Sequence, residues 1–195
     1  PPVDSLIFVS PYLIGVRDET LYRCDPSEAE PAWPLVAATV GTTNVRFTRI
    51  APVLVTAPIP TINARAVGVA KDLKLYALTF TGTPLKADCT VLRSSVDETV
   101  TPAAILRVDN RLVAVAVGPA VTGRRLLGFQ STVGALAQQA IAEVPLGTSA
   151  VIGNAIDAGV ANLRGVFALC LGETDGTSKV SRWSPFEAGL PDLLF

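Results

Sequence analysis

Residues 105–117 read ILRVDNRLVAVAV, and this stretch decides the fold class of the chain. Two apolar runs flank the dipeptide Asp109-Asn110. Asp and Asn both tolerate the positive φ that a tight two-residue hairpin turn requires. We therefore predict two antiparallel strands joined at Asp109-Asn110.

Similar apolar segments, separated by prolines and glycines, occupy most of the chain before this hairpin. They are rich in β-branched residues and recur at intervals of roughly 8–12 residues, which is typical of antiparallel sandwiches and barrels. The loop at residues 25–34 contains three prolines and three acidic residues, so we expect it to be exposed. We predict a mainly β fold, an antiparallel sandwich or barrel, with strands at residues 6–9, 12–16, 21–24, 35–40, 45–50, 52–56, 66–70, 73–81, 89–93 and 103–108.

The C-terminal third has a different pattern, because residues 118–171 contain only five charged side chains. Apolar side chains between Val133 and Val144 fall on one helical face, and Pro145 follows them. This spacing predicts a helix at about residues 132–143.

A second helix at residues 152–170 also fits the apolar spacing. Gly153, Gly159 and Gly165 oppose it, since each glycine inside a helix costs about 1 kcal/mol relative to alanine. Strands are the alternative at this place. We divide the chain into a β-rich region and a mixed helix and strand region, packed together as one domain, at residues 1–118 and 119–195.

The composition lacks the residue type on which much enzyme chemistry depends. The chain has 195 residues, of which 49% are hydrophobic and 17% charged, and none is histidine. Histidine is the commonest acid–base catalyst and metal ligand. Soluble chains carry about 25% charged residues, so the apolar excess indicates burial against other subunits. We predict no catalytic residue, no metal and no cofactor.

The charge pattern disfavours nucleic acid as a partner. The net charge is −1, and the basic residues form no run beyond the pair Arg124-Arg125, whereas nucleic-acid binders display a basic stripe. No stretch reaches the roughly 20 uninterrupted apolar residues of a membrane span. The first residues lack a signal-peptide pattern, so we expect synthesis in the cytoplasm.

Three cysteines, Cys24, Cys89 and Cys170, are widely spaced and form no Cys-x-x-Cys pair. This spacing encodes neither a zinc knuckle nor a thioredoxin-type site. The simplest interpretation is that all three are small buried hydrophobic residues. One intramolecular disulfide, or disulfides between subunits, are the alternatives.

These features together favour a non-enzymatic structural subunit of a large homomeric assembly. A virion protein, such as a phage capsid, decoration, tail or collar protein, fits the low charge, the proline-rich segments and the apolar C-terminus. The partners would be copies of the chain itself and other structural proteins of the same assembly. The residues that we expect at its interfaces are Leu136, Ile141, Ile152, Ile156, Leu163, Phe167, Trp183, Phe186, Leu193, Leu194 and Phe195.

Two alternatives come from other functional classes. One is a ligand- or receptor-binding β-sandwich with an exposed aromatic and acidic patch near residues 173–183. The other is a small enzyme, because Pro1 resembles the amino-terminal proline that the tautomerase superfamily uses as a general base. That resemblance implies a βαβ unit, whereas Ser10-Pro11 is followed here by more β-like sequence.

Overall fold

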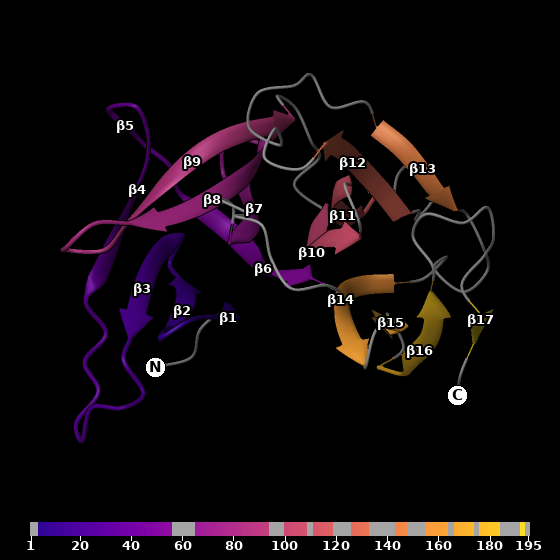
Figure 1. The fold of residues 1–195 in the computed structure, drawn as a ribbon, viewed down its shortest axis with the longest axis horizontal. Helices are drawn as coiled ribbons and strands as arrows, with labels where there is room; N and C mark the ends of the chain where they lie inside the picture. Colours follow the sequence, from indigo (N-terminus) through magenta and orange to yellow (C-terminus); the bar gives the residue numbers. More distant parts are fainter. Residues whose placement is uncertain are drawn as a thin grey trace.

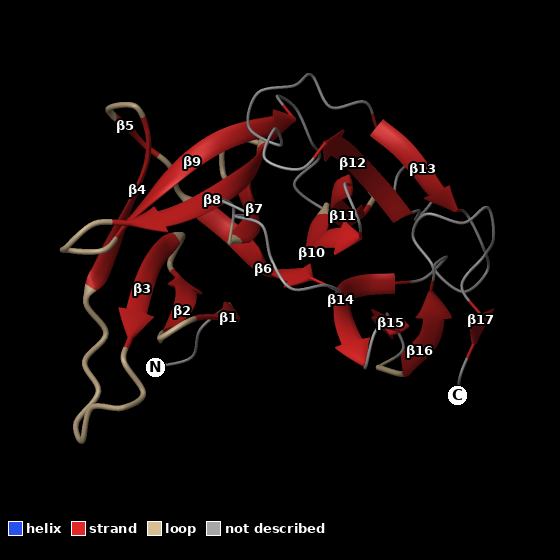
Figure 2. Ribbon diagram, viewed as in Figure 1, coloured by secondary structure: helices blue, strands red, loops and turns tan. Residues whose placement is uncertain are grey.

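The computed structural model describes residues 4–55, 65–93, 100–108, 111–118, 126–132, 143–147, 155–163, 166–173, 176–183 and 192–193. Within these ranges the chain forms strands and loops and no helix (Figure 2). The mainly β fold class that the sequence predicts is therefore confirmed for the described part of the chain. No helix long and apolar enough to cross a membrane is found among the same residues.

The larger of two sheets contains thirteen strands and runs through the first three quarters of the chain. Its spatial order is β1-β2-β3-β4-β9-β8-β7-β6-β10-β11-β12-β13, and β5 pairs with β4. The strands are β1 (Ser5–Val9), β2 (Tyr12–Arg17), β3 (Thr20–Cys24), β4 (Leu35–Val40), β5 (Thr43–Asn44), β6 (Phe47–Val55), β7 (Ala66–Ala70), β8 (Leu75–Thr81), β9 (Lys86–Arg93), β10 (Thr101–Val108), β11 (Arg111–Val117), β12 (Leu126–Thr132) and β13 (Glu143–Gly147).

The smaller sheet contains four strands in the order β14-β15-β16-β17 and packs beside the larger one (Figure 1). Strand β14 contacts β6, β10 and β11, so the two sheets are in contact. The break between them falls after β13. The strands of this sheet are β14 (Ala155–Leu163), β15 (Val166–Glu173), β16 (Ser178–Trp183) and β17 (Asp192–Leu193).

Most neighbouring strands are antiparallel, but two pairs in the large sheet are parallel. Strand β4 pairs in parallel with β9, and β6 pairs in parallel with β10. The ladder is an open path that begins at β1 and ends at β13. The large sheet is therefore mixed rather than purely antiparallel.

Strand β6 continues through Pro52, where the sequence pattern predicted a break between two strands. Residues Phe47 to Pro52 pair with β7, whereas Val53 to Val55 pair with β10. Proline has no backbone N–H and cannot donate to a ladder. Pro52 therefore lies at the position where β6 exchanges one partner for another.

Strands β7 and β8 form a wall between two buried clusters, because their side chains alternate between two faces. Ala66 and Ala70 of β7 belong to a cluster shared with β1–β4, β6 and β9, which we call the first cluster. Val67 and Val69 belong to the second cluster, which includes Ile105 of β10. All five residues of β7 are buried. A strand buried on both faces explains the uninterrupted apolar sequence there.

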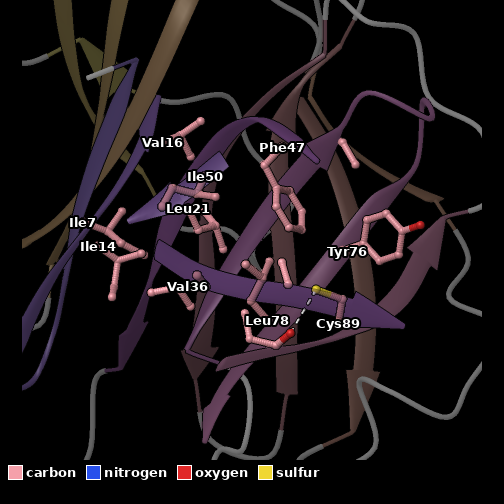
Figure 3. Packing of buried hydrophobic residues seen from close by; sticks show 14 residues of the cluster. Ile7, Ile14, Val16, Leu21, Val36, Phe47, Ile50, Tyr76, Leu78 and Cys89 are labelled. Atoms are coloured by element: carbon pink, nitrogen blue, oxygen red, sulfur yellow. Dashed lines mark hydrogen bonds between the residues drawn. The ribbon is translucent and has the colours of Figure 1, made fainter. Parts of the chain in front are cut away.

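Figure 3 shows how the first cluster is filled from opposite sides. Ile14 and Leu21 come from β2 and β3, and Phe47, Tyr76 and Leu78 come from β6 and β8. The rings of Phe47 and Tyr76 meet edge to face, with centroids 5.9 Å apart and planes at 82°. This geometry is one that aromatic pairs prefer, and it joins β6 to β8 across β7.

The hairpin predicted around Asp109-Asn110 is confirmed by the register of its strands. Strands β10 and β11 pair antiparallel, with Val108 opposite Arg111 across the connecting dipeptide. The dipeptide itself lies outside the described residues.

The two helices predicted for the C-terminal third have different outcomes. Most of the predicted helix at 132–143 lies outside the described residues, and its end residues Thr132 and Glu143 belong to strands β12 and β13. The alternative helix at 152–170 is wrong, because β14 and β15 form an antiparallel hairpin there. Glycine is a poor helix former, and Gly159 lies in β14 opposite Cys170 of β15.

Candidate functional site: an uncharged sheet face

Two adjacent rows of side chains on the side of β1–β4 that points away from the first cluster are uncharged. Cross-strand pairing aligns Leu6, Gly15, Tyr22 and Leu35 in one row across the four strands. A neighbouring row contains Phe8, Leu13 and Cys24, of which Cys24 is buried. We call these two rows the outer face. None of its seven residues carries a formal charge.

The outer face contains the most exposed large apolar side chains in the described residues. Phe8 is 61% exposed, Leu35 60% and Leu6 49%. Trp33, which precedes β4, is 38% exposed. An antiparallel sheet with one face on a core normally presents polar side chains on its other face. The outer face departs from that pattern, and exposed apolar patches of this kind mark interaction sites.

Charged groups lie at the borders of the outer face and not within it. At one end, Nε of Arg17, the last residue of β2, lies 3.4 Å from Oδ2 of Asp18 in the turn that follows. At the other end, the loop of residues 25–34 projects away from the strands and carries Asp25, Glu28 and Glu30 (Figure 1). The carboxylate of Asp25 accepts hydrogen bonds from the N–H and hydroxyl of Ser27, which lower its pKa.

A cleft of about 330 Å³ adjoins the first residues of β1. It lies between β1, β6, β10 and β14, where the two sheets meet, and Leu6 of the outer face contributes to its wall. Ser5 Oγ accepts a hydrogen bond of 3.0 Å from the backbone N–H of Ile50 at this place. Asp4 and Arg49 also line the cleft, so its wall combines apolar surface with one acidic and one basic side chain.

Among the described residues, the titratable groups with strongly shifted pKa values lie in or beside the first cluster and do not converge on this cleft. Burial raises the pKa of the Cys89 thiol to about 12. Burial also raises the pKa of Tyr76, whose hydroxyl donates a 2.7 Å hydrogen bond to Asp72 Oδ2. The described ranges contain no group of three or more Cys, Asp or Glu side chains placed to hold a metal ion. The raised pKa values of Cys89 and Tyr76 are therefore explained by burial in the first cluster.

The sequence-predicted interface residues lie in the second sheet or outside the described residues. Five of them occupy strands β14 to β17, and Phe167 pairs with Trp183 across β15 and β16. The positions within strands are Ile156, Leu163, Phe167, Trp183 and Leu193, and the positions outside the described ranges are Leu136, Ile141, Ile152, Phe186, Leu194 and Phe195. Whether these residues form interfaces stays a prediction.

The three cysteines are free thiols in this structure, so it contains no intramolecular disulfide among them. Cys24 and Cys89 are buried, as the simplest interpretation of the sequence expected, whereas Cys170 is half-buried. The Cys89 thiol donates a 3.6 Å hydrogen bond to the Ala87 carbonyl.

The outer face was not predicted from the sequence. A signal was present in the run Leu6-Ile7-Phe8-Val9, which has no polar residue at alternate positions. A continuous apolar run in a strand indicates burial on both faces, whereas Ile7 and Val9 pack on the first cluster and Leu6 and Phe8 lie on the other side.

Comparison with known proteins adds no further assignment. The sequence matches no protein-family model, and no curated protein is detectably similar to it.

Proposed function

We propose that this protein is a non-enzymatic structural subunit of a large homomeric assembly, of the kind found in phage capsids, decorations, tails or collars. The observation that carries the proposal is the uncharged outer face of β1–β4, with Phe8 61% and Leu35 60% exposed. Full burial of one large apolar side chain contributes about 1.5–3 kcal/mol relative to exposure. Several such side chains on one face favour association of subunits.

The composition of the whole chain supports the same function. With 17% charged residues and a net charge of −1, copies of the chain repel one another little. Obligate interfaces are more apolar than ordinary surfaces, which gives the hydrophobic excess a physical role.

We also infer that β1–β4 and β6–β9 wrap the first cluster in the manner of a small barrel. The support is the contact between β1 and β6, where the Ile50 N–H donates to Ser5 Oγ at 3.0 Å. Such wrapping holds the outer face on a rigid support, because the opposite side of the same strands is packed in the core.

The mass of the particle in solution tests the proposed function. We expect multi-angle light scattering to find species several times heavier than the 20.4 kDa chain, and negative-stain microscopy to find regular particles. A stable monomer across the accessible concentration range contradicts the proposal.

A second candidate function rests on the cleft between β1, β6, β10 and β14. Its volume of about 330 Å³ falls within the range of small-ligand pockets, roughly 300–1,000 Å³. A binding module that uses this cleft predicts NMR shift changes confined to Ser5, Ala51, Ala103 and Gly159 on titration with short peptides or oligosaccharides. Unchanged spectra with both classes of probe exclude this use of the cleft. Pro1, on which the enzymatic alternative depends, lies outside the described residues, and β1 is followed by the β2 hairpin strand.

A further inference from the structure

We propose that the outer face packs against the same face of a second copy, in a two-fold contact where each copy presents identical residues. This inference rests on the proposed function and names the surface that would serve it. It differs from a head-to-tail contact, in which two different surfaces of the chain meet.

The chemistry of the outer face selects a partner that is itself uncharged and apolar. Residues 5–16, which comprise β1, the turn after it and β2 up to its last residue Arg17, contain no charged side chain. An acidic or basic partner gains no charge attraction there, and its own charges lose hydration on contact. A second copy of the face matches without like-charge repulsion.

No other described surface of the chain matches the outer face equally well. Beyond this face and the neighbouring Trp33, the large apolar side chains found to be exposed, among those whose burial the structure describes, are Leu73 and Val91. Leu73 lies in a turn between Asp72 and Lys74, which form an ion pair of 3.2 Å. Isolated apolar side chains of this kind are ordinary on protein surfaces. Among the side chains whose exposure the structure describes, the outer face is therefore the best complement to itself.

The arrangement of side chains on the outer face is compatible with packing of one sheet on another. Phe8 and Leu13 form a cross-strand pair in one row, and the next row has Gly15 between Leu6 and Tyr22. Gly15 itself is buried, so the contact would be made by the exposed side chains of Leu6, Phe8 and Leu35. Stacked sheets pack about 10 Å apart by interdigitation of such side chains.

The first test changes Phe8, which is the most exposed side chain of the outer face at 61%. Phe8→Lys places a charge on the face, and we expect the dissociation constant measured by sedimentation to rise at least about ten-fold. Leu73→Lys makes the same kind of change at a side chain that is 41% exposed and lies off the face, so we expect it to leave association unchanged. Circular dichroism of both variants checks that the fold is retained.

Each outcome has a distinct meaning. A monomeric wild type overturns both the proposed function and this inference. A wild type that assembles, with Phe8→Lys as strongly associated as Leu73→Lys, overturns the inference alone and leaves the proposed function in place. If circular dichroism shows that Phe8→Lys does not fold, Leu35→Lys takes its place in the same comparison, because the Leu35 side chain is 60% exposed.

Crosslinking distinguishes a two-fold contact from a head-to-tail contact. In a two-fold contact, a cysteine at Leu6 of one copy lies on the same interface as the cysteine at Leu6 of the other. We expect a bis-maleimide with a spacer longer than the ~10 Å between stacked sheets to yield covalent dimers of Leu6→Cys. Leu73→Cys and the wild type, which retains its native cysteines, serve as controls. Equal dimer yields from Leu6→Cys and Leu73→Cys overturn the inference.

Discussion

The ring of Phe47 occupies the space that a side chain at position 68 would need. A methyl group on Gly68 would lie 2.6 Å from Cδ1 and 2.8 Å from Cε1 of that ring. Phe47 is completely buried and also packs edge to face on Tyr76. The glycine in β7 is therefore a steric requirement of the aromatic pair in the first cluster.

We expect Gly68→Ala to destabilise the protein by about 1–3 kcal/mol, the usual cost of overpacking a dense core. Urea unfolding followed by tryptophan fluorescence measures the change. The matched control is Gly159→Ala, because a methyl group there meets nothing within 4 Å. We expect that control to change the free energy of unfolding by less than about 1 kcal/mol. An equal effect of both substitutions contradicts the steric explanation.

A double-mutant cycle with Phe47→Ala separates the steric clash from the backbone effect of alanine. Removing the ring costs about 3–5 kcal/mol by itself. On that background Gly68→Ala no longer meets the ring, so its additional cost should shrink to near zero. A cost that stays the same in both backgrounds assigns the effect to the strand backbone.

The carboxylate of Glu19 ties the β2–β3 turn to the middle of the large sheet. Lys71 Nζ lies 2.8 Å from Glu19 Oε1, and Arg46 Nη1 lies 3.8 Å from Glu19 Oε2. Both cationic side chains are largely exposed, so the pair contributes about 0.2–1 kcal/mol. We expect Glu19→Gln to lower the free energy of unfolding by this amount in dilute buffer and by less in 1 M NaCl. Asp18→Asn, at a carboxylate 84% exposed, should have no measurable effect.

Local patterns in the sequence predicted most strands of the fold. Apolar segments bounded by proline and glycine became β1 to β4 and β7 to β11, and the Asp109-Asn110 hairpin has the expected register. These features depend on neighbouring residues alone. Leu73 is a small exception, because its φ of 58° places it in a turn before β8 and not within the strand.

Pairing between distant segments could not be predicted in the same way. The parallel pairs β4–β9 and β6–β10 join segments about fifty residues apart, and no local pattern specifies such partners. Residues 152–170 also satisfied both helical and strand spacing, since small residues there weaken the contrast between faces. The outer face was missed for a related reason. An apolar run predicts a strand, but it does not specify which side of that strand faces the core.

The hydroxyl of Thr81 holds the Asp88 carboxylate in its charged form. Thr81 Oγ1 donates a 2.7 Å hydrogen bond to Asp88 Oδ2, and this bond is the main reason why the pKa of Asp88 is lowered. A lowered carboxyl pKa in the folded state stabilises the fold above the ordinary value of 3.8, and this stabilisation is lost as the pH falls through the folded-state pKa. We expect the pKa of Asp88 to rise in Thr81→Val and to stay low in Thr81→Ser. An NMR titration of the side-chain carboxyl carbon measures it, and identical titrations in the two variants contradict the assignment.

The Cys89 thiol should resist alkylation until the first cluster opens. Burial raises its pKa to about 12, and the negative charge of Asp88 adds to that rise, so at pH 8 only roughly one thiol in ten thousand is ionised. The thiolate is the nucleophile, and the buried sulfur is also inaccessible to reagent. We expect iodoacetamide to modify half-buried Cys170 first and Cys89 only as fast as the fold opens, as measured by mass spectrometry of peptides. Gly68→Ala should then speed the labelling of Cys89 in proportion to its loss of stability, because it strains the same cluster. Rapid labelling of Cys89 in the native wild type would show that this side of the cluster opens locally.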